Sequence, residues 1–330
     1  TTQAASVSSG EVPGNGASSG ASVSADGTKV VFASGATNLV TGDTNGKRDV
    51  FVRDLVAGTT TRVSRSGATQ GNGASTAPSI SDDGGVVAFE TLASNLVSGD
   101  TNGQSDVMVW TGGAGVTRIS HPGNIGQANG ASTRPAVRGD GLVVAFESAA
   151  SNLVSGDTNG RIDVFLLTLA APLPSRASVS SSGGQGNGDS TRASLSDDGL
   201  LVAFATDATN FVSGDTNGQT DVVVRDFAAL TTSIVSASSA RTRANGASTS
   251  PALAGAAPLV VYHSSASNLV PADTNALPDV YSSTALRCDG RAVTVDLGAA
   301  QTPTAAVDVV RGTANADVVD LGAGADRACL

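Results

Sequence analysis

The sequence predicts an all-β protein: a five-bladed β-propeller of four-stranded blades, followed by a small β appendage at the C-terminus. Two observations lead to this fold class. The phrase Gly-Asp-Thr-Asn-Gly recurs at a nearly constant spacing, and each interval between its copies holds four short apolar segments separated by polar, glycine-rich turns. Repeated four-stranded units of this size are typical of propellers, in which each blade buries its faces against its neighbours.

The repeat has five copies. Four are intact, at residues 42–46, 99–103, 156–160 and 214–218, and the fifth reads Ala-Asp-Thr-Asn-Ala at residues 272–276. Their aspartates are 57, 57, 58 and 58 residues apart. A fixed period indicates one structural unit used five times. A second phrase, Asn-Gly-Ala-Ser, keeps the same step from Asn15 to Asn72, Asn129, Asn187 (with Asp189 in place of alanine) and Asn245.

The second copy shows the four strands of one unit in order. We expect a first strand over 77–81, a tight turn at 82–84, a second strand over 86–90, a polar loop over 94–103, a third strand over 106–110 and a fourth over 116–120. The runs are short, rich in β-branched residues and bounded by glycine and aspartate, as strands are.

The other copies fit the same register. Second strands carry an aromatic residue at one shared position, namely Phe32, Phe89, Phe146, Phe204 and Tyr262. Third strands are expected over 49–53, 106–110, 163–167, 221–225 and 279–283. Asp-Gly pairs at 26–27, 83–84, 140–141 and 198–199 predict a tight turn after each first strand. The fifth copy has Gly255-Ala256-Ala257 there and is the least regular.

The two ends of the repeat predict how the ring closes. The fifth copy supplies three strands before the composition changes near Cys288, while Ala4–Ser8 matches the fourth strands of other copies. We therefore expect the N-terminal strand to complete the last blade, which removes exposed sheet edges. Pairing of that strand with a neighbouring chain would instead give a polymer. The predicted domains are the propeller, 1–286, and a C-terminal segment, 287–330.

The core of each copy, Ser-x-Asp-Gly-x-x-Val-Ala-Phe-x-Ser followed by Asp-Val-Phe-Val, resembles the TolB-like β-propeller repeat of secreted bacterial proteins. Residues 196–206 and 221–224 show it best, and the resemblance covers about residues 1–286. It implies the fold rather than a function, because propellers host many activities. This sequence departs from the simple repeat by inserting the Asn-Leu-Val-x-Gly-Asp-Thr-Asn-Gly loop.

Composition excludes some partners. The formal net charge is −10, the basic residues form no cluster, and nucleic acid is therefore not expected as a partner. No apolar run approaches the roughly 18 residues of a membrane helix. The chain begins at Thr1 and its one methionine is Met108, so we expect that an upstream secretory signal was removed and that the protein is extracellular.

The inserted loop has the oxygen-rich spacing of a cation site. Read with its flanks, it resembles the calcium loop Asp-x-Asp-x-Asp-Gly-x-x-Asp of EF-hand-like sites and integrin blades, with the first aspartate replaced. The residues that would ligate Ca²⁺ are Thr41, Asp43, Asn45, Lys47 (by its carbonyl) and Asp49; Ser98, Asp100, Asn102, Gln104 and Asp106; Ser155, Asp157, Asn159, Arg161 and Asp163; Ser213, Asp215, Asn217, Gln219 and Asp221; and Asp273, Asn275 and Asp279. Asp and Asn also close turns without metal, so both interpretations stay open.

The C-terminal segment lacks the 57-residue period. Residues 311–319 and 321–328 resemble hemolysin-type (RTX) nonapeptides, which implies Ca²⁺ near Asp317 and Asp326. Cys288 and Cys329 flank this segment, and in a secreted protein they are expected to form a disulfide. The alternatives are a β appendage without metal and two unpaired thiols.

No catalytic constellation is visible. His121 and His263 lie in different repeats and outside any triad motif, and Glu90 and Glu147 occupy equivalent second-strand positions where a structural role is expected. The sequence therefore predicts a secreted, calcium-stabilised, non-enzymatic propeller that binds an extracellular protein or glycan, or serves as a surface scaffold. The alternatives are a self-associating subunit of a filament or surface layer, and a hydrolase with an unrecognised site.

Overall fold

The computed structural model describes residues 2–113, 115–123, 126–254, 259–271, 273–275 and 277–284, together with the backbone of five short strands between 287 and 329. All regular elements described are β-strands, and the described chain holds no helix that could cross a membrane. The expected all-β class is thus confirmed. Four antiparallel sheets of four strands and one of three follow each other along the chain. We call them blades 1 to 5.

The strands of each blade are consecutive in the sequence. Blade 1 comprises β1 (Ser18–Val23), β2 (Lys29–Ser34), β3 (Asp49–Asp54) and β4 (Thr59–Arg62); blade 2 comprises β7 (Ser75–Ile80), β8 (Val87–Thr91), β9 (Asp106–Trp110) and β10 (Val116–Arg118). Blade 3 comprises β11 (Ser132–Val137), β12 (Val143–Ser148), β13 (Asp163–Thr168) and β14 (Ala171–Arg176); blade 4 comprises β15 (Ser190–Leu195), β16 (Leu201–Thr206), β17 (Asp221–Asp226) and β18 (Thr231–Ile234). Blade 5 comprises β19 (Ser248–Leu253), β20 (Leu259–Ser264) and β21 (Asp279–Thr284).

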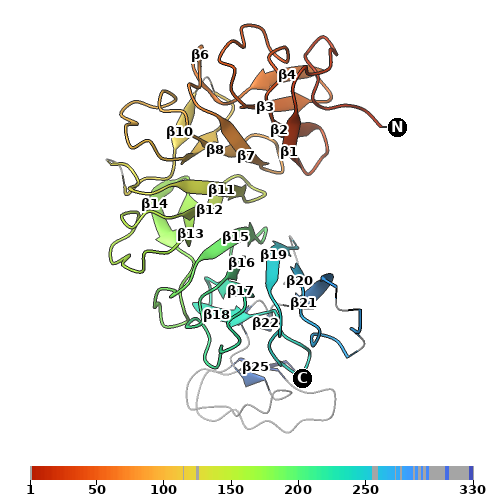
Figure 1. The fold of residues 1–330 in the computed structure, drawn as a ribbon, viewed down its shortest axis with the longest axis vertical. Helices are drawn as coiled ribbons and strands as arrows, with labels where there is room; N and C mark the ends of the chain where they lie inside the picture. The colour runs from red at the N-terminus through yellow and green to blue at the C-terminus, as the bar shows by residue number, and fades with distance from the viewer. Residues whose placement is uncertain are drawn as a thin grey trace.

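The blades follow each other along an arc, with their first strands innermost (Figure 1). The predicted aromatic position of the second strand is buried in every blade, from Phe32 to Tyr262. Four of the five core clusters in the described residues lie between two neighbouring blades, and the fifth lies within blade 1. Val31 of blade 1 packs with Phe89 of blade 2, for example, and the next cluster joins Val107 to Phe146 of blade 3. A blade buries both faces only through its neighbours, which explains why the unit is repeated.

Glycine is required both in the Asp-Gly turns and in the Asn-Gly-Ala-Ser phrase. The predicted Asp-Gly turns are present, and Gly27, Gly84, Gly141 and Gly199 have φ between +64° and +74°. The glycine of Asn-Gly-Ala-Ser is required for a different reason, namely the lack of space for a side chain. A Cβ on Gly73 would lie 2.4 Å from the carbonyl carbon and oxygen of Leu92, and the equivalent glycines are equally crowded by backbone. The asparagines beside them join the blade-linking loop to the loop after the second strand: Asn72 N donates to Asn95 Oδ1 at 2.9 Å. The blade-linking loops and the loops after the second strands therefore lie at the same rim.

The expected pairing of Ala4–Ser8 with the last blade is wrong for this structure. In the described residues β21 pairs only with β20, and Val7 forms a bridge with Pro13. The segment lies against blade 1, where the Thr60 hydroxyl donates to Val7 O at 2.5 Å. The loop after the fourth strand of blade 3 lies on blade 4 in the same way, with Thr232 donating to Val179 O at 2.6 Å. The match was therefore out of phase: residues 5–8 correspond to the loop that follows a fourth strand, not to the strand itself.

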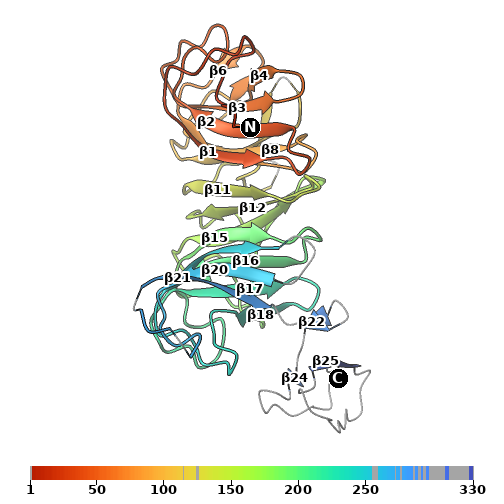
Figure 2. The ribbon, with the colours of Figure 1, turned by 90° about the vertical axis from the view of Figure 1, so that its right-hand side faces the viewer.

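The C-terminal segment contains only short strands in the described residues. They are β22 (Arg287–Cys288), β23 (Arg291–Ala292), β24 (Val295–Asp296), β25 (Val309–Arg311) and β26 (Arg327–Cys329), and the last three form a parallel sheet. Figure 2 shows β22, β24 and β25 apart from the stack of blades. Asp317 and Asp326 lie outside the described residues, as do the cysteine side chains, so the RTX and disulfide predictions are untested.

Candidate functional site

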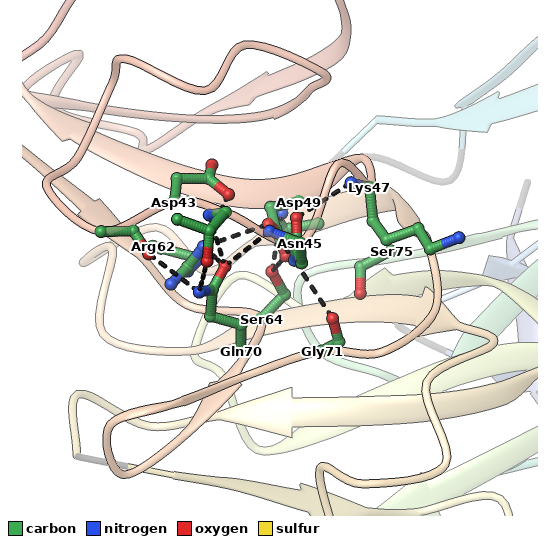
Figure 3. Close-up of polar contacts among 12 residues, drawn as sticks. Asp43, Asn45, Lys47, Asp49, Arg62, Ser64, Gln70, Gly71 and Ser75 are labelled. Carbon is green, nitrogen blue, oxygen red and sulfur yellow. Dashed lines mark hydrogen bonds and ion pairs between the residues drawn. The ribbon is translucent and has the colours of Figure 1, made fainter.

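The predicted calcium loop of blade 1 is organised around an arginine (Figure 3). Arg62, the last residue of β4, places Nη1 3.1 Å from Asp43 Oδ1 and 3.3 Å from Asp49 Oδ2. Asp49 opens β3 and is fully buried; its Oδ1 accepts from the Ser64 hydroxyl at 2.6 Å, and its Oδ2 accepts from Asn45 Nδ2 at 2.9 Å. Both carboxylates of this loop are therefore compensated by an arginine of the same blade.

A glutamine completes the network in blade 1. Gln70, in the hairpin of β5 (Arg65–Ser66) and β6 (Thr69–Gln70), accepts from Arg62 Nη1 at 3.1 Å and from the Thr44 N–H at 3.0 Å through Oε1. Its Nε2 donates to Gly42 O at 2.8 Å. The inserted loop is thus hydrogen-bonded to the chain segment that leads into the next blade, and these bonds hold the loop rigidly in place.

Blades 2 and 3 repeat this arrangement. Arg118 Nη1 lies 3.5 Å from Asp100 and 3.3 Å from Asp106, and Arg176 Nη1 lies 3.1 Å from Asp157 and 3.2 Å from Asp163. Gln127 and Gln185 take the place of Gln70. Burial raises the pKa of Asp43, Asp100 and Asp157, and the second aspartate of each loop adds to this effect, whereas the arginine opposes it.

These three loops do not fit Ca²⁺. A guanidinium already lies between the two carboxylates, within ion-pair distance of both, where the cation would have to bind. The other proposed ligands serve the turn. The backbone N–H of Lys47, Gln104 and Arg161 donates to Oδ1 of Asn45, Asn102 and Asn159, respectively. Thr41, Ser98 and Ser155 are exposed. The alternative interpretation, turn closure by Asp and Asn, describes blades 1 to 3.

Blade 4 differs at two positions. Ile234 stands where blades 1 to 3 have arginine, and Arg243 stands where they have glutamine. Arg243 donates through Nη2 to Ser213 O at 2.6 Å and through Nε to Gly214 O at 3.1 Å. Asp215 is 8% exposed and its Oδ1 has no hydrogen-bond partner. Burial raises the pKa of both Asp215 and Asp221, because the charged form loses its hydration.

The rest of the blade 4 loop follows the common plan. Asn217 Nδ2 donates to Asp221 Oδ2 at 3.3 Å, the Ser236 hydroxyl donates to Asp221 Oδ1 at 2.6 Å, and the Gln219 N–H donates to Asn217 Oδ1 at 2.8 Å. In blade 5 the hydroxyl of Tyr281 donates to Asp273 Oδ2 at 2.7 Å. This bond, above all, raises the pKa of Tyr281 to about 12. Asn275 Nδ2 donates to Asp279 Oδ2 at 3.3 Å.

A second polar cluster, which the sequence interpretation missed, lies at the axis. The innermost strands β1, β7, β11, β15 and β19 together line a cavity of about 400 Å³. Each carries a bulge, and the bulged residue has a positive φ in all five: Gly20, Ala77, Arg134, Arg192 and Ser250. Two guanidinium groups therefore reach the axis at positions that are small in the other blades.

Glu90 and Glu147 hold this axial cluster together. Glu90 Oε2 accepts from the Arg134 N–H at 2.9 Å, and Glu147 Oε1 accepts from the Arg192 N–H at 2.5 Å. Glu147 is 2% exposed and also pairs with Arg134 Nη1 at 3.3 Å. The expected structural role of both glutamates is what the geometry shows. The signal for this cluster was present in the sequence as a departure from the repeat at equivalent positions.

Neither histidine takes part in a catalytic arrangement within the described residues. Burial lowers the pKa of His121, whose Nδ1 is buried without a hydrogen-bond partner. His263 is exposed on β20.

No protein-family model and no curated protein matches the sequence. Solved structures do match. TolB from Acinetobacter baumannii aligns with a TM-score of 0.45 and 17% identity over 77% of this chain and 53% of its own, so this chain spans about half its length. A putative TolB from Agrobacterium tumefaciens gives 0.47 and 14% over 84% of this chain and 79% of its own. A puromycin-hydrolysing peptidase from Mycobacterium tuberculosis gives 0.48 and 15% over 82% and 38%.

Each of these identities is below 20% and each TM-score is below 0.5, so the matches are likenesses only and carry no argument about this chain. The functional proposals below therefore depend on the residues of this chain.

Proposed function

We propose that this chain is a non-enzymatic β-propeller that acts outside the cell as a binding or scaffold module. The observation that carries the proposal is the closed polar network of the rim loops. In blades 1 to 3 each buried aspartate is compensated by an arginine of its own blade. Groups held in this way build a rigid frame and supply no free acid, base or nucleophile. An extracellular location is part of the proposal.

Among the blades, calcium enters the proposal only at blades 4 and 5. Blade 4 lacks the internal arginine, and the buried Oδ1 of Asp215 has no partner. Asp215, Asp221 and Asn217 would hold the ion, and its charge would replace that of the missing guanidinium. In blade 5 the residues are Asp273, Asp279 and Asn275. Burial raises the pKa of Asp215, and the positive charge of the nearby Arg243 opposes this rise, so a weak site is expected.

Thermal unfolding with and without Ca²⁺ tests this part. A bound ion stabilises the folded form by mass action, so the melting temperature should rise with Ca²⁺ and fall with EDTA. Asp215→Asn should reduce the response, whereas Asp100→Asn in blade 2 should leave it unchanged. The same response in wild type and Asp215→Asn would exclude blade 4, and no response at all in wild type would remove calcium from the proposal.

A closed five-bladed ring is also part of the proposal. Residues 5–8 already lie on blade 1 as the corresponding loops lie on later blades. By the repeat, Ser6 is equivalent to Ser178, whose hydroxyl donates to Asp163 at 2.5 Å, so Ser6 should donate to Asp279. Leu166 pairs with Ser175 in blade 3, which places Gln3 opposite Ser282. Closure would bury Val280, which is 72% exposed although its equivalents in blades 1 to 4 are fully buried.

The filament is the second candidate, and the open edge of β21 favours it, because an unpaired edge can accept a strand from another chain. A double variant, Gln3→Cys with Ser282→Cys, separates the two. A closed ring gives an internal disulfide between these cysteines, found by peptide mapping, in a monomer. A filament gives the same bond between chains. Failure to form the bond in either way would reject both forms of strand pairing.

A further inference from the structure

The axial cavity departs from the repeat in one sector. Its bulged positions hold glycine, alanine and serine in blades 1, 2 and 5, but Arg134 and Arg192 in the adjacent blades 3 and 4. The serine that donates to the first aspartate of each third strand is, in contrast, the same in blades 1 to 4. A concentrated departure from an otherwise maintained repeat marks a surface that serves a purpose other than holding the blades together.

The backbone holds both arginines in an uncommon conformation. Their φ angles are +46° and +58°, in the left-handed region that side chains other than glycine rarely adopt. Each is fixed there by a glutamate of the preceding blade, which accepts its N–H. A residue that its surroundings hold in such a conformation is preorganised. Its backbone is already fixed in the position from which the side chain enters the cavity.

The charge of the arginines is only partly used. Arg134 pairs with Glu147, but its side chain remains 55% exposed. Arg192 Nη1 donates to the Ser250 hydroxyl at 3.1 Å, and no carboxylate lies within ion-pair distance of it among the described residues. Glu90 and Glu147 are meanwhile occupied by backbone N–H groups, and Glu90 also accepts from Thr76 at 2.8 Å. Guanidinium donors therefore remain available in a chain whose net charge is −10.

We propose that Arg134 and Arg192 form a binding site for a small oxyanion, a carboxylate or phosphate group, in the axial cavity. The planar fork of a guanidinium matches both groups. The cavity of about 400 Å³ has room for a ligand of the size of citrate, and Pro78, Pro135 and Pro251 give it a stiff apolar wall. The site deepens the proposed binding role, on which it rests, by naming the chemistry of the ligand.

Isothermal titration calorimetry with citrate and, separately, inorganic phosphate tests the site. Ionic strength is held constant with NaCl, because exposed charges are screened by salt. We expect wild type to bind at least one probe with a dissociation constant near or below about 1 mM. Arg192→Ala and Arg134→Ala should each weaken binding by about tenfold or more, the usual effect of losing a charged hydrogen bond. Binding of citrate alone would identify a carboxylate site, and binding of inorganic phosphate alone would identify a phosphate site.

Two further variants make the test specific. Arg161→Ala removes an exposed guanidinium of a rim loop and should leave binding unchanged. Ser250→Arg places a third guanidinium at the next equivalent bulge, where φ is already +53°, and should tighten binding. Absence of binding by both probes, or equal binding by wild type and both alanine variants, would overturn the oxyanion site. Capture of a protein or glycan at the rim would still support the proposed binding role in that case.

Discussion

Arg62→Met tests whether an internal arginine, rather than a metal ion, organises the rim loops. Arg62 has an 8% exposed side chain and lies 3.1 and 3.3 Å from two carboxylates. At an effective dielectric constant of about 20, each contact corresponds to about 5 kcal/mol of direct attraction, most of which is offset by the desolvation of the charges. Methionine keeps the volume but leaves Asp43 and Asp49 buried without compensation. We expect a loss of about 3–5 kcal/mol in the free energy of unfolding, as for other broken buried pairs.

The pH dependence of this loss identifies its cause. Burial already raises the pKa of Asp43, and the neighbouring Asp49 adds to that effect. Without Arg62 the pKa in the folded state should rise further. A carboxyl group with a raised folded-state pKa binds its proton more readily in the folded state, so the penalty is present at high pH and is relieved as the pH falls through that pKa. The loss should therefore be smaller at pH 5 than at pH 7.5.

Urea unfolding of wild type and Arg62→Met at both pH values provides the measurement. The matched control is Arg161→Met, which alters an exposed arginine of the equivalent loop in blade 3 and should change stability by no more than about 0.5 kcal/mol. Hydrogen exchange at residues 43–49 should accelerate only in Arg62→Met. A loss below about 1 kcal/mol, or an equal loss at the two pH values, would show that the arginine does not compensate buried carboxylates.

Two further predictions concern packing and charge. Gly73→Ala should cost about 1–3 kcal/mol in urea unfolding, because its Cβ would meet the Leu92 backbone at 2.4 Å; Gly113→Ala in the same blade meets no atom within 4 Å and should be neutral or slightly stabilising. Asp215→Asn should stabilise the calcium-free protein at pH 7.5, and this gain should shrink toward pH 4, because Asp215 has a raised folded-state pKa. Destabilisation by Asp215→Asn at neutral pH would show that its charge is compensated.

The strands could be predicted because each is specified locally. Alternating apolar residues, the shared aromatic position and the Asp-Gly turns gave third strands that begin at Asp49, Asp106, Asp163, Asp221 and Asp279, as in the structure. The alignment of the N-terminal residues with the repeat was not predicted correctly, because Val7 resembles a strand residue. The correct alignment matches Ser6 with the buried serines that follow the fourth strands. A single serine, rather than a hydrophobic pattern, therefore determines this alignment.

The rim loops show why the chemistry of a site is harder to predict than its position. The spacing of Asp43, Asn45 and Asp49 is the same for a calcium loop and for a loop built around a guanidinium. What decides between them is Arg62, which comes from the next hairpin and reaches both carboxylates only once β3 and β4 pair. Blade 4 supports this view from within the same chain. There the arginine is absent from the fourth strand, Arg243 has moved to the position of Gln70, and Asp215 retains an unpartnered oxygen.

Comparison between blades therefore carries information that a single blade lacks. Positions that stay constant, such as the serine that donates to the first aspartate of each third strand in blades 1 to 4, are required by the frame. At other positions the residue type differs between neighbouring blades although the backbone conformation is the same. These side chains are not required to hold the blades together. Arg134 and Arg192 are such positions, and two glutamates of preceding blades fix their conformation. The frame tolerates alanine, glycine or serine there, so two adjacent guanidinium groups are best explained by what they bind.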